Sequence, residues 1–166
     1  LMAGFAVLAA LAGGTSFEHL RGVFATGPAA SVAFVLLTLG FGTKAGLVPM
    51  HVWLPRAHPE APSHVSAAMS AAMVKMGVYG LLLTLQLLPN GPRWWALLLL
   101  LLGLASALYG ILQASVNSDL KRLLAYSTTE NVGLAVTAIG LGMLLANAGQ
   151  SEAASVARLS ALLLVV

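Results

Sequence analysis

The sequence predicts an all-α fold, a polytopic bundle of transmembrane helices, and two observations lead to this prediction. Of the 166 residues, 59% are hydrophobic and only 8% are charged, whereas a soluble domain carries about 25% charged residues. The apolar residues also form long runs, several of which reach the roughly 20 residues that a helix needs to cross a bilayer. The chain has too few charges to cover a water-facing surface, so lipid is its expected solvent.

Four segments are long enough to span a membrane: residues 29–54, 62–88, 94–115 and 119–145. Shorter apolar runs occupy residues 1–13 and 153–166. At 1.5 Å per residue each of these runs reaches about 20 Å, less than the ~30 Å hydrocarbon core. We therefore expect residues 1–166 to be part of a single transmembrane domain that is truncated at both ends. The first run has no basic residues before it, so a signal peptide explains it poorly.

The connections between the predicted spans contain turn-forming residues. Residues 15–28 are mildly amphipathic and are expected at the membrane interface, while residues 55–62 and 89–92 are proline-bounded turns. Trp94 and Trp95 follow the second turn, where an interfacial aromatic belt would lie. The polar run 117–119 is expected to cap the helix that continues from it.

The basic residues of the connections give a weak indication of orientation. Arg56, Lys121 and Arg122 belong to connections on one side of the membrane, and Arg21 and Arg93 to those on the other. The positive-inside rule then places residues 55–61 and 116–122 in the cytoplasm of a multi-pass protein of the cell (inner or cytoplasmic) membrane.

Composition also excludes several classes of function. The net charge is +3, but the basic residues are scattered singly and form no patch for nucleic acid. Cysteine is absent, so the chain has no disulfides, no thiolate zinc site and no iron–sulfur ligands. Phosphate-binding glycine loops are absent too. We expect no cofactor in this chain, and any redox cofactor would belong to a partner.

Three ionisable residues lie near the midpoints of three different predicted spans: Lys44, Lys75 and Glu130. A charge at mid-depth costs at least about 2.5–3.5 kcal/mol on insertion scales, so such residues are usually functional. Burial lowers the pKa of a lysine and raises that of a carboxyl group, which brings both towards neutral pH. This pattern favours a proton relay. The alternative is structural, with the lysines pairing with carboxylates to hold helices together.

Polar neighbours support a hydrated path along these spans. His64 lies eleven residues before Lys75, about three helical turns, and Tyr79 lies four residues after it, so all three are expected on one face. Tyr126 and Thr129 are placed similarly beside Glu130. Taken one at a time, a tyrosine or threonine is better explained by ordinary helix–helix hydrogen bonding.

A glycine and a proline, Gly46 and Pro49, interrupt the first span just after Lys44. A broken helix at membrane depth frees backbone groups, which protein or water must satisfy. The alternative is a packing kink, but the nearby lysine favours an element of an ion path.

Three histidines, His51, His58 and His64, are spaced by seven and six residues. Zinc sites favour tighter, paired spacings, so we expect no metal. Capping of the connection and proton uptake near the surface are better interpretations of His51 and His58.

Two stretches together resemble a known family. Residues 41–80, FGTKAGLVPMHVWLPRAHPEAPSHVSAAMSAAMVKMGVYG, and residues 118–133, SDLKRLLAYSTTENVG, resemble the antiporter-like proton-translocating membrane subunits. That family includes the membrane-arm subunits of complex I, the Mrp-type cation/proton antiporters and the membrane components of energy-converting hydrogenases. The pair Glu130-Asn131 and the run AAMVKMGVYG resemble the hydrogenase-4 and formate hydrogenlyase branch.

The resemblance implies roles for individual residues. Lys44 matches the lysine of the broken helix, Lys75 the central-channel lysine, and Lys121 the basic residue of a short loop that opens the later helix. Complex I subunits commonly have histidine at the position of Glu130. In the family, a glutamate that partners Lys44 lies on an earlier helix, and a later helix carries a further His and Lys. Neither helix is covered here.

The implied function is proton translocation without a redox site of its own, coupled to electron transfer in a partner complex of hydrogenase or NADH:quinone oxidoreductase type. Its expected partners are other membrane subunits and a peripheral redox arm. A stand-alone Na⁺/H⁺ antiporter is the main alternative, but it would want more carboxylates than Glu130 in its spans. A purely structural anchor leaves the mid-depth charges unexplained, and nothing resembles a quinone headgroup site.

Overall fold

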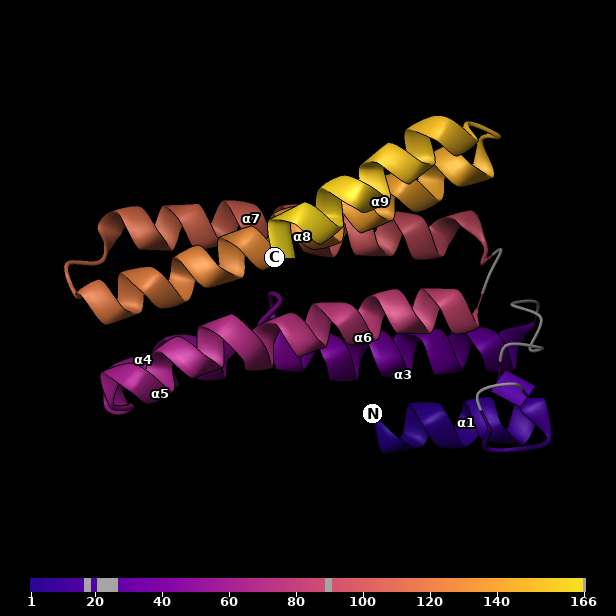
Figure 1. Cartoon of the computed structure of the whole chain (residues 1–166), viewed down its shortest axis with the longest axis horizontal. Coiled ribbons are helices and arrows are strands. Elements are labelled where there is room, and N and C mark those ends of the chain that lie inside the picture. Colours follow the sequence, from indigo (N-terminus) through magenta and orange to yellow (C-terminus); the bar gives the residue numbers. More distant parts are fainter. Residues whose placement is uncertain (17–18, 21–26, 89–90, 166) are drawn as a thin grey trace.

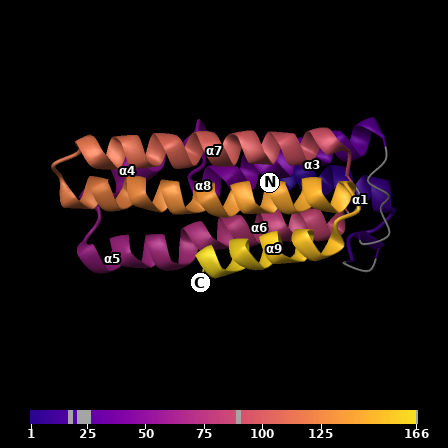
Figure 2. The ribbon, with the colours of Figure 1, turned by 90° about the horizontal axis from the view of Figure 1, so that it is seen from above.

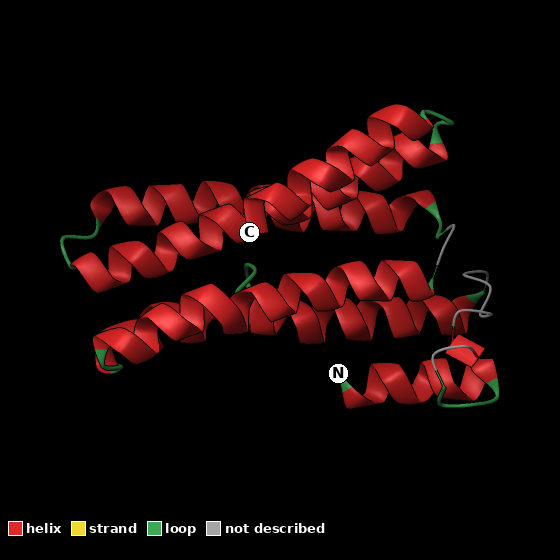
Figure 3. Cartoon of the chain, in the orientation of Figure 1, coloured by secondary structure: helices red, strands yellow, loops and turns green. Residues whose placement is uncertain are grey.

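The computed structural model describes residues 1–16, 19–20, 27–88 and 91–165, and these residues form helices and connections without any strand (Figure 3). The α-helices described, in chain order, are α1 (Met2–Ala12), α3 (Pro28–Ala45), α4 (Leu54–Glu60), α5 (Ser63–Ala68), α6 (Val74–Leu87), α7 (Arg93–Val116), α8 (Leu120–Asn147) and α9 (Ser151–Val165). A 3₁₀ helix, η1 (Met50–Trp53), joins α3 to α4, and a π-helix, Met69–Met73, joins α5 to α6. The predicted all-α fold is confirmed.

Four helical stretches are long and apolar enough to cross a membrane: Pro28–Glu60, Ser63–Leu87, Arg93–Val116 and Leu120–Asn147. They correspond to the four predicted spans. The two shorter apolar runs are helical as well, in α1 and α9. Residues 17–18 and 21–26 of the predicted interfacial link, Arg21 included, and residues 89–90 of the second turn lie outside the described residues.

The helices lie in two layers along one long axis (Figures 1 and 2). One layer contains the antiparallel pair α7 and α8 with α9 packed on α8, and the other contains α3 beside α6, with α1 against α3. Contacts of α4 and α6 with α8 join the layers. The core between them is apolar and aromatic, and includes Phe34 stacked on the buried ring of Trp95 with centroids 4.2 Å apart.

The α7–α8 pair packs backbone to backbone. A methyl group on Gly110 would lie 2.7 Å from the Glu130 amide nitrogen and 2.8 Å from the Tyr126 carbonyl oxygen, so only glycine fits there. Helices in lipid gain little from the hydrophobic effect, and small residues let them approach closely enough for van der Waals contact. This packing fixes the position of Glu130 relative to α7.

Two predictions, one for a connection and one for a pair of tryptophans, differ from the structure. Residues 54–60 form helix α4 and not a tight turn, because Pro55 falls in the first turn, where its missing N–H is harmless, and Leu54, Pro55 and His58 bury one helical face. Trp95 lies in the core, whereas Trp94 is 41% exposed, so only Trp94 fits an interfacial belt.

The predicted cap of the fourth span is confirmed. Asp119 Oδ1 accepts a hydrogen bond of 2.9 Å from the Lys121 amide at the start of α8. Lys121 Nζ in turn donates to the carbonyl oxygens of Pro59 (3.3 Å) and Ala61 (2.9 Å). The α4–α5 and α7–α8 connections therefore lie at the same end of the molecule, as the alternation of spans predicts.

Candidate functional site

The break after Lys44 is built from glycine, proline and a distant serine. Helix α3 ends at Ala45, and Gly46 takes a left-handed conformation with φ 78° and ψ 35°. The helix ends there because a left-handed residue lets the Leu47 amide bond back to the Gly42 carbonyl, at 2.9 Å. The departure from regular helix that Gly46 and Pro49 predict is present, and its part in an ion path stays a prediction.

The backbone freed by this break is satisfied from the other layer. The Val48 amide donates to Ser106 Oγ of α7 at 2.9 Å, and that hydroxyl donates to the Leu102 carbonyl at 2.6 Å. The indole N–H of Trp53 bonds to the Thr43 carbonyl at 2.7 Å. Sequence reasoning missed Ser106, since nothing near it in the chain indicates a partner 58 residues away.

Lys44 lies in the last turn of α3 and is half-buried. The C-terminal carbonyl groups of a helix carry partial negative charge, so the fold places this cation where a helix end stabilises it. The break thus begins at a positive charge.

Lys75 borders a cavity of about 300 Å³ between α6, α8 and the end of α9. Its lining residues are Ser70, Val74, Lys75, Val78, Thr128, Asn131, Val132 and Leu164. Ser70 Oγ and Thr128 Oγ1 lie 2.8 Å apart across the two layers, in hydrogen-bond contact. A half-buried lysine and three polar side chains therefore meet at one partly open cavity beside the π-helix.

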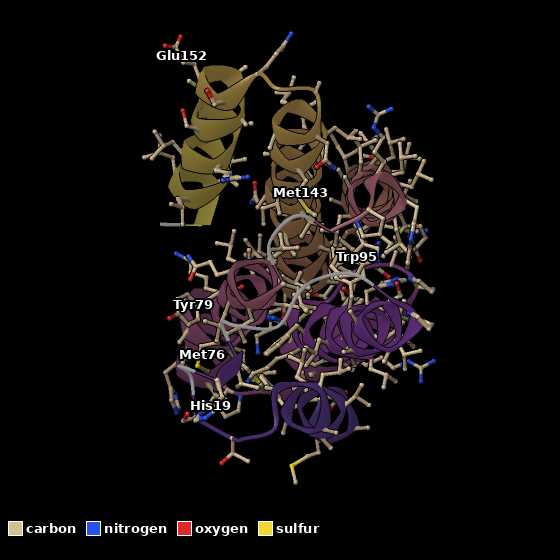
Figure 4. The ribbon with its side chains drawn as sticks, turned by 90° about the vertical axis from the view of Figure 1, so that its right-hand side faces the viewer. His19, Met76, Tyr79, Trp95, Met143 and Glu152 are labelled. Carbon is tan, nitrogen blue, oxygen red and sulfur yellow. The ribbon has the colours of Figure 1, made fainter. Side chains whose placement is uncertain are left out.

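The π-helix changes the phase of the predicted polar face. Its i→i+5 bonding takes an extra residue into the turn, so His64 and Lys75 do not share the face that an uninterrupted α-helix would give them. His64 is exposed, and Tyr79 is 65% exposed at the outer surface of α6 (Figure 4). Neither residue lines the cavity beside Lys75.

Glu130 is half-buried on α8, on a different side from that cavity. It is ~100° around the helix from Asn131 and ~200° from Thr128, which both line the cavity. Its neighbour Thr129 is fully buried and bonds back to the Ala125 carbonyl at 3.4 Å. Lys44, Lys75 and Glu130 thus come from three helices, but the structure does not bring them into one cavity.

An aromatic row runs from the break towards Glu130. The buried ring of His51 packs against Tyr109 of α7 with centroids 4.6 Å apart, and Tyr109 packs against Tyr126 at 6.2 Å. Tyr126 is one turn before Glu130 on α8. Sequence reasoning missed Tyr109, which stands alone on an apolar helix.

His51 and His58 are buried and lie in helical segments, so their expected place in an open connection is wrong. The reason is the helical folding of residues 50–60, which turns both rings inward. His58 Nδ1 contacts Ser66 Oγ at 2.5 Å, and its Nε2 has no hydrogen-bond partner among the described residues. Within the same part of the chain, no group of three His, Asp or Glu side chains could hold a metal ion.

Comparisons with known proteins agree with this architecture. Residues 1–159 match the family described as NADH:quinone oxidoreductase/Mrp antiporter, transmembrane. The chain is 45% identical over 146 residues to hydrogenase-4 component B of Escherichia coli, covering 86% of this chain and 22% of that protein. It is 42% identical over 117 residues to formate hydrogenlyase subunit 3 of the same organism, covering 70% and 19%.

A solved structure shares the fold. A chain of respiratory complex I from Thermus thermophilus superposes with a TM-score of 0.70 and 30% identity, over 98% of this chain and 37% of that one. The chain spans about a fifth to a quarter of the length of the curated relatives it matches.

Proposed function

Because this chain belongs to the NADH:quinone oxidoreductase/Mrp antiporter transmembrane family, we propose that it is the part of a membrane subunit that carries protons across the middle of the bilayer. The chain is a multi-pass membrane protein. Lys44, Lys75 and Glu130 are the proposed proton carriers. The driving force is electron transfer in a partner complex of hydrogenase or NADH:quinone oxidoreductase type, in the cytoplasmic membrane.

The observation that carries the proposal is the environment of Lys75. A lysine at mid-span is half-buried beside a partly open cavity that is also lined by Ser70, Thr128 and Asn131. An ionisable residue at this depth is functional by default. The surrounding hydroxyl and amide groups are suited to hold water that passes protons, and the cavity is large enough for several water molecules.

The broken segment and the aromatic row lie beside the other two proposed carriers, Lys44 and Glu130. Lys44 stands at the end of α3, beside carbonyl groups that carry partial negative charge. The row of His51, Tyr109 and Tyr126 leads from the break towards Glu130. The proposed sequence is exchange at the lysines and release beyond Glu130.

The names of the relatives support a redox partner. They describe a hydrogenase component and a formate hydrogenlyase subunit, and the solved homologue is respiratory complex I. A stand-alone cation/proton antiporter is the alternative, since the family description includes Mrp antiporters. It predicts sodium-dependent exchange without any redox partner, which the experiment below also measures.

The test is Lys75→Arg in the intact protein, assembled in its complex and reconstituted into vesicles. Arginine keeps the positive charge but cannot release its proton in a protein, whereas lysine can. We expect normal assembly and a loss of most redox-driven proton translocation. The matched control is Arg122→Lys, a basic exchange at a 56% exposed side chain outside the cavity, which should translocate normally.

Wild-type translocation by Lys75→Arg at equal complex abundance would rule out proton exchange at Lys75 and favour a structural charge. Sodium-driven proton exchange by wild-type vesicles that lack the redox partner would favour the antiporter alternative.

A further inference from the structure

A second cavity, of about 390 Å³, lies at the opposite end of the molecule from the Lys121 contacts, between the ends of α6 and α8 and the first half of α9. It shares no lining residue with the cavity beside Lys75. Its volume falls within the range of about 300–1,000 Å³ that is usual for small-molecule pockets. The proposed proton path does not use it.

The walls of this cavity have an apolar part and a polar part. The apolar part consists of Leu82, Leu85, Leu88, Ile139 and Met143. Figure 4 shows Met143 on the side of α8 that faces the other layer. The polar part consists of Gln86, Asn147 and Arg158. These polar groups come from the last turns of α6 and α8 and from the middle of α9.

Two details show that the polar part is organised. The stem of Arg158 lies on α8, because a methyl group added to Gly142 would sit 3.2 Å from Arg158 Cγ. Asn147 Nδ2 is buried and has no hydrogen-bond partner among the described residues. A buried amide donor without a partner is costly, so this position favours a bound acceptor.

The position of the cavity points to a lipid. Asn147 is the last residue of α8, and Arg158 lies about 10 Å along α9 from Ser151, so both are within reach of the membrane–water interface. Arginine binds phosphate oxygens through two parallel N–H groups. The apolar walls would then contact the beginning of an acyl chain.

The charge of the cavity selects among lipids. Arg158 is the one charged side chain among the described lining residues, and no carboxylate is present there to pair with the ammonium of a zwitterionic headgroup. We propose that this cavity binds an anionic membrane phospholipid, with its phosphate at Arg158 and Asn147 and its acyl chain against Leu85 and Met143.

The test uses the intact protein, delipidated in detergent and titrated with phosphatidylglycerol while native mass spectrometry counts the bound molecules. Arg158→Gln should weaken the binding of one phosphatidylglycerol about tenfold or more, since a hydrogen bond to a charged group is lost. Arg158→Lys keeps the charge and should weaken it less. The matched control is Arg93→Gln, an exposed arginine at the same end that does not line the cavity, and it should bind as wild type.

Equal phosphatidylglycerol binding by Arg158→Gln and Arg93→Gln would overturn the proposal, provided that both variants keep the wild-type thermal midpoint. So would equal binding of phosphatidylcholine and phosphatidylglycerol to the wild type. Displacement of the lipid by millimolar inorganic phosphate would identify a site for a soluble anion and would likewise overturn it. Proton translocation is not part of the readout, so this test can fail without bearing on Lys75.

Discussion

Single side chains supply the hydrogen bonds that an interrupted helix loses in lipid. Ser106 is fully buried on α7 and accepts the bond of the Val48 amide just before Pro49. Water cannot replace this acceptor in the hydrocarbon region, where unsatisfied backbone groups are costly. The helix break at Gly46 and Pro49 therefore depends on a serine of another span for a backbone hydrogen bond.

Replacing this serine should destabilise the protein. Ser106→Ala leaves the partly buried Val48 amide without its acceptor, at a cost of about 1–3 kcal/mol. We expect a lower thermal midpoint for the intact protein in detergent. Ser115→Ala is the control, because Ser115 is exposed and bonds only to the Leu112 carbonyl of its own helix. Equal midpoints for the two variants would contradict the role of Ser106.

At the residue scale, local chemistry could be predicted and distant partners could not. Gly46 and Pro49 indicate a break because of their own backbone preferences, and Asp119 indicates a cap because its target is two residues away. The partners of Lys121 lie about 60 residues earlier, at the end of α4 and just after it. Tertiary packing decides such pairs, and one sequence contains no sign of them.

Among the helices, the α7–α8 pair depends most on close backbone approach. Alanine normally stabilises a helix by about 1 kcal/mol relative to glycine at the same position. At Gly110 the added methyl group would press on the backbone of Tyr126 and Glu130. Overpacking of this kind costs roughly 1–3 kcal/mol and shifts the backbone.

Gly110→Ala should therefore lower the thermal midpoint in spite of its better helix propensity, and it should displace Glu130. The comparison is Ala105→Val, which adds two methyl groups at an exposed position of the same helix. A midpoint for Gly110→Ala at or above the wild-type value would show that α7 and α8 can separate at no cost.

The spans could be predicted because length and apolar composition are sufficient evidence of a transmembrane helix. Helix α4 was not predicted, because Pro55 and Pro59 resemble a turn when the buried face of Leu54, Pro55 and His58 is unknown. The π-helix was not predicted either. Its residues, Met69–Met73, are compatible with an ordinary α-helix, so nothing in the sequence indicates the irregularity.

For the whole molecule, a few polar contacts fix how the two layers meet. One joins Ser70 of the π-helix to Thr128 of α8, beside the cavity at Lys75. Another joins Val48 to Ser106, and the Lys121 contacts hold one end. The roles of Lys44, Lys75 and Glu130 stay predictions, and their division between separate spaces, which the sequence does not indicate, depends on this arrangement.

A pair of engineered cysteines tests the arrangement. In an intact protein without other cysteines, Ser70→Cys with Thr128→Cys should form a disulfide on mild oxidation, because the two hydroxyl oxygens lie 2.8 Å apart. Ser70→Cys with Thr137→Cys is the control, about 13 Å further along α8. Protection of both thiols from maleimide labelling measures the bond. Full labelling of the first pair after oxidation would show that the layers meet elsewhere.

The π-helix has a consequence for how this span is compared with other helices. Helices α5 and α6 are continuous along one axis, but they differ in phase by about one residue, or ~100° of rotation. A helical wheel drawn across residues 63–87 ignores this offset. It therefore places His64 and Lys75 on one face that the two residues do not share. Two separate wheels, one ending at Ala68 and one starting at Val74, place a buried stripe on α6 alone, because no residue of α5 is buried.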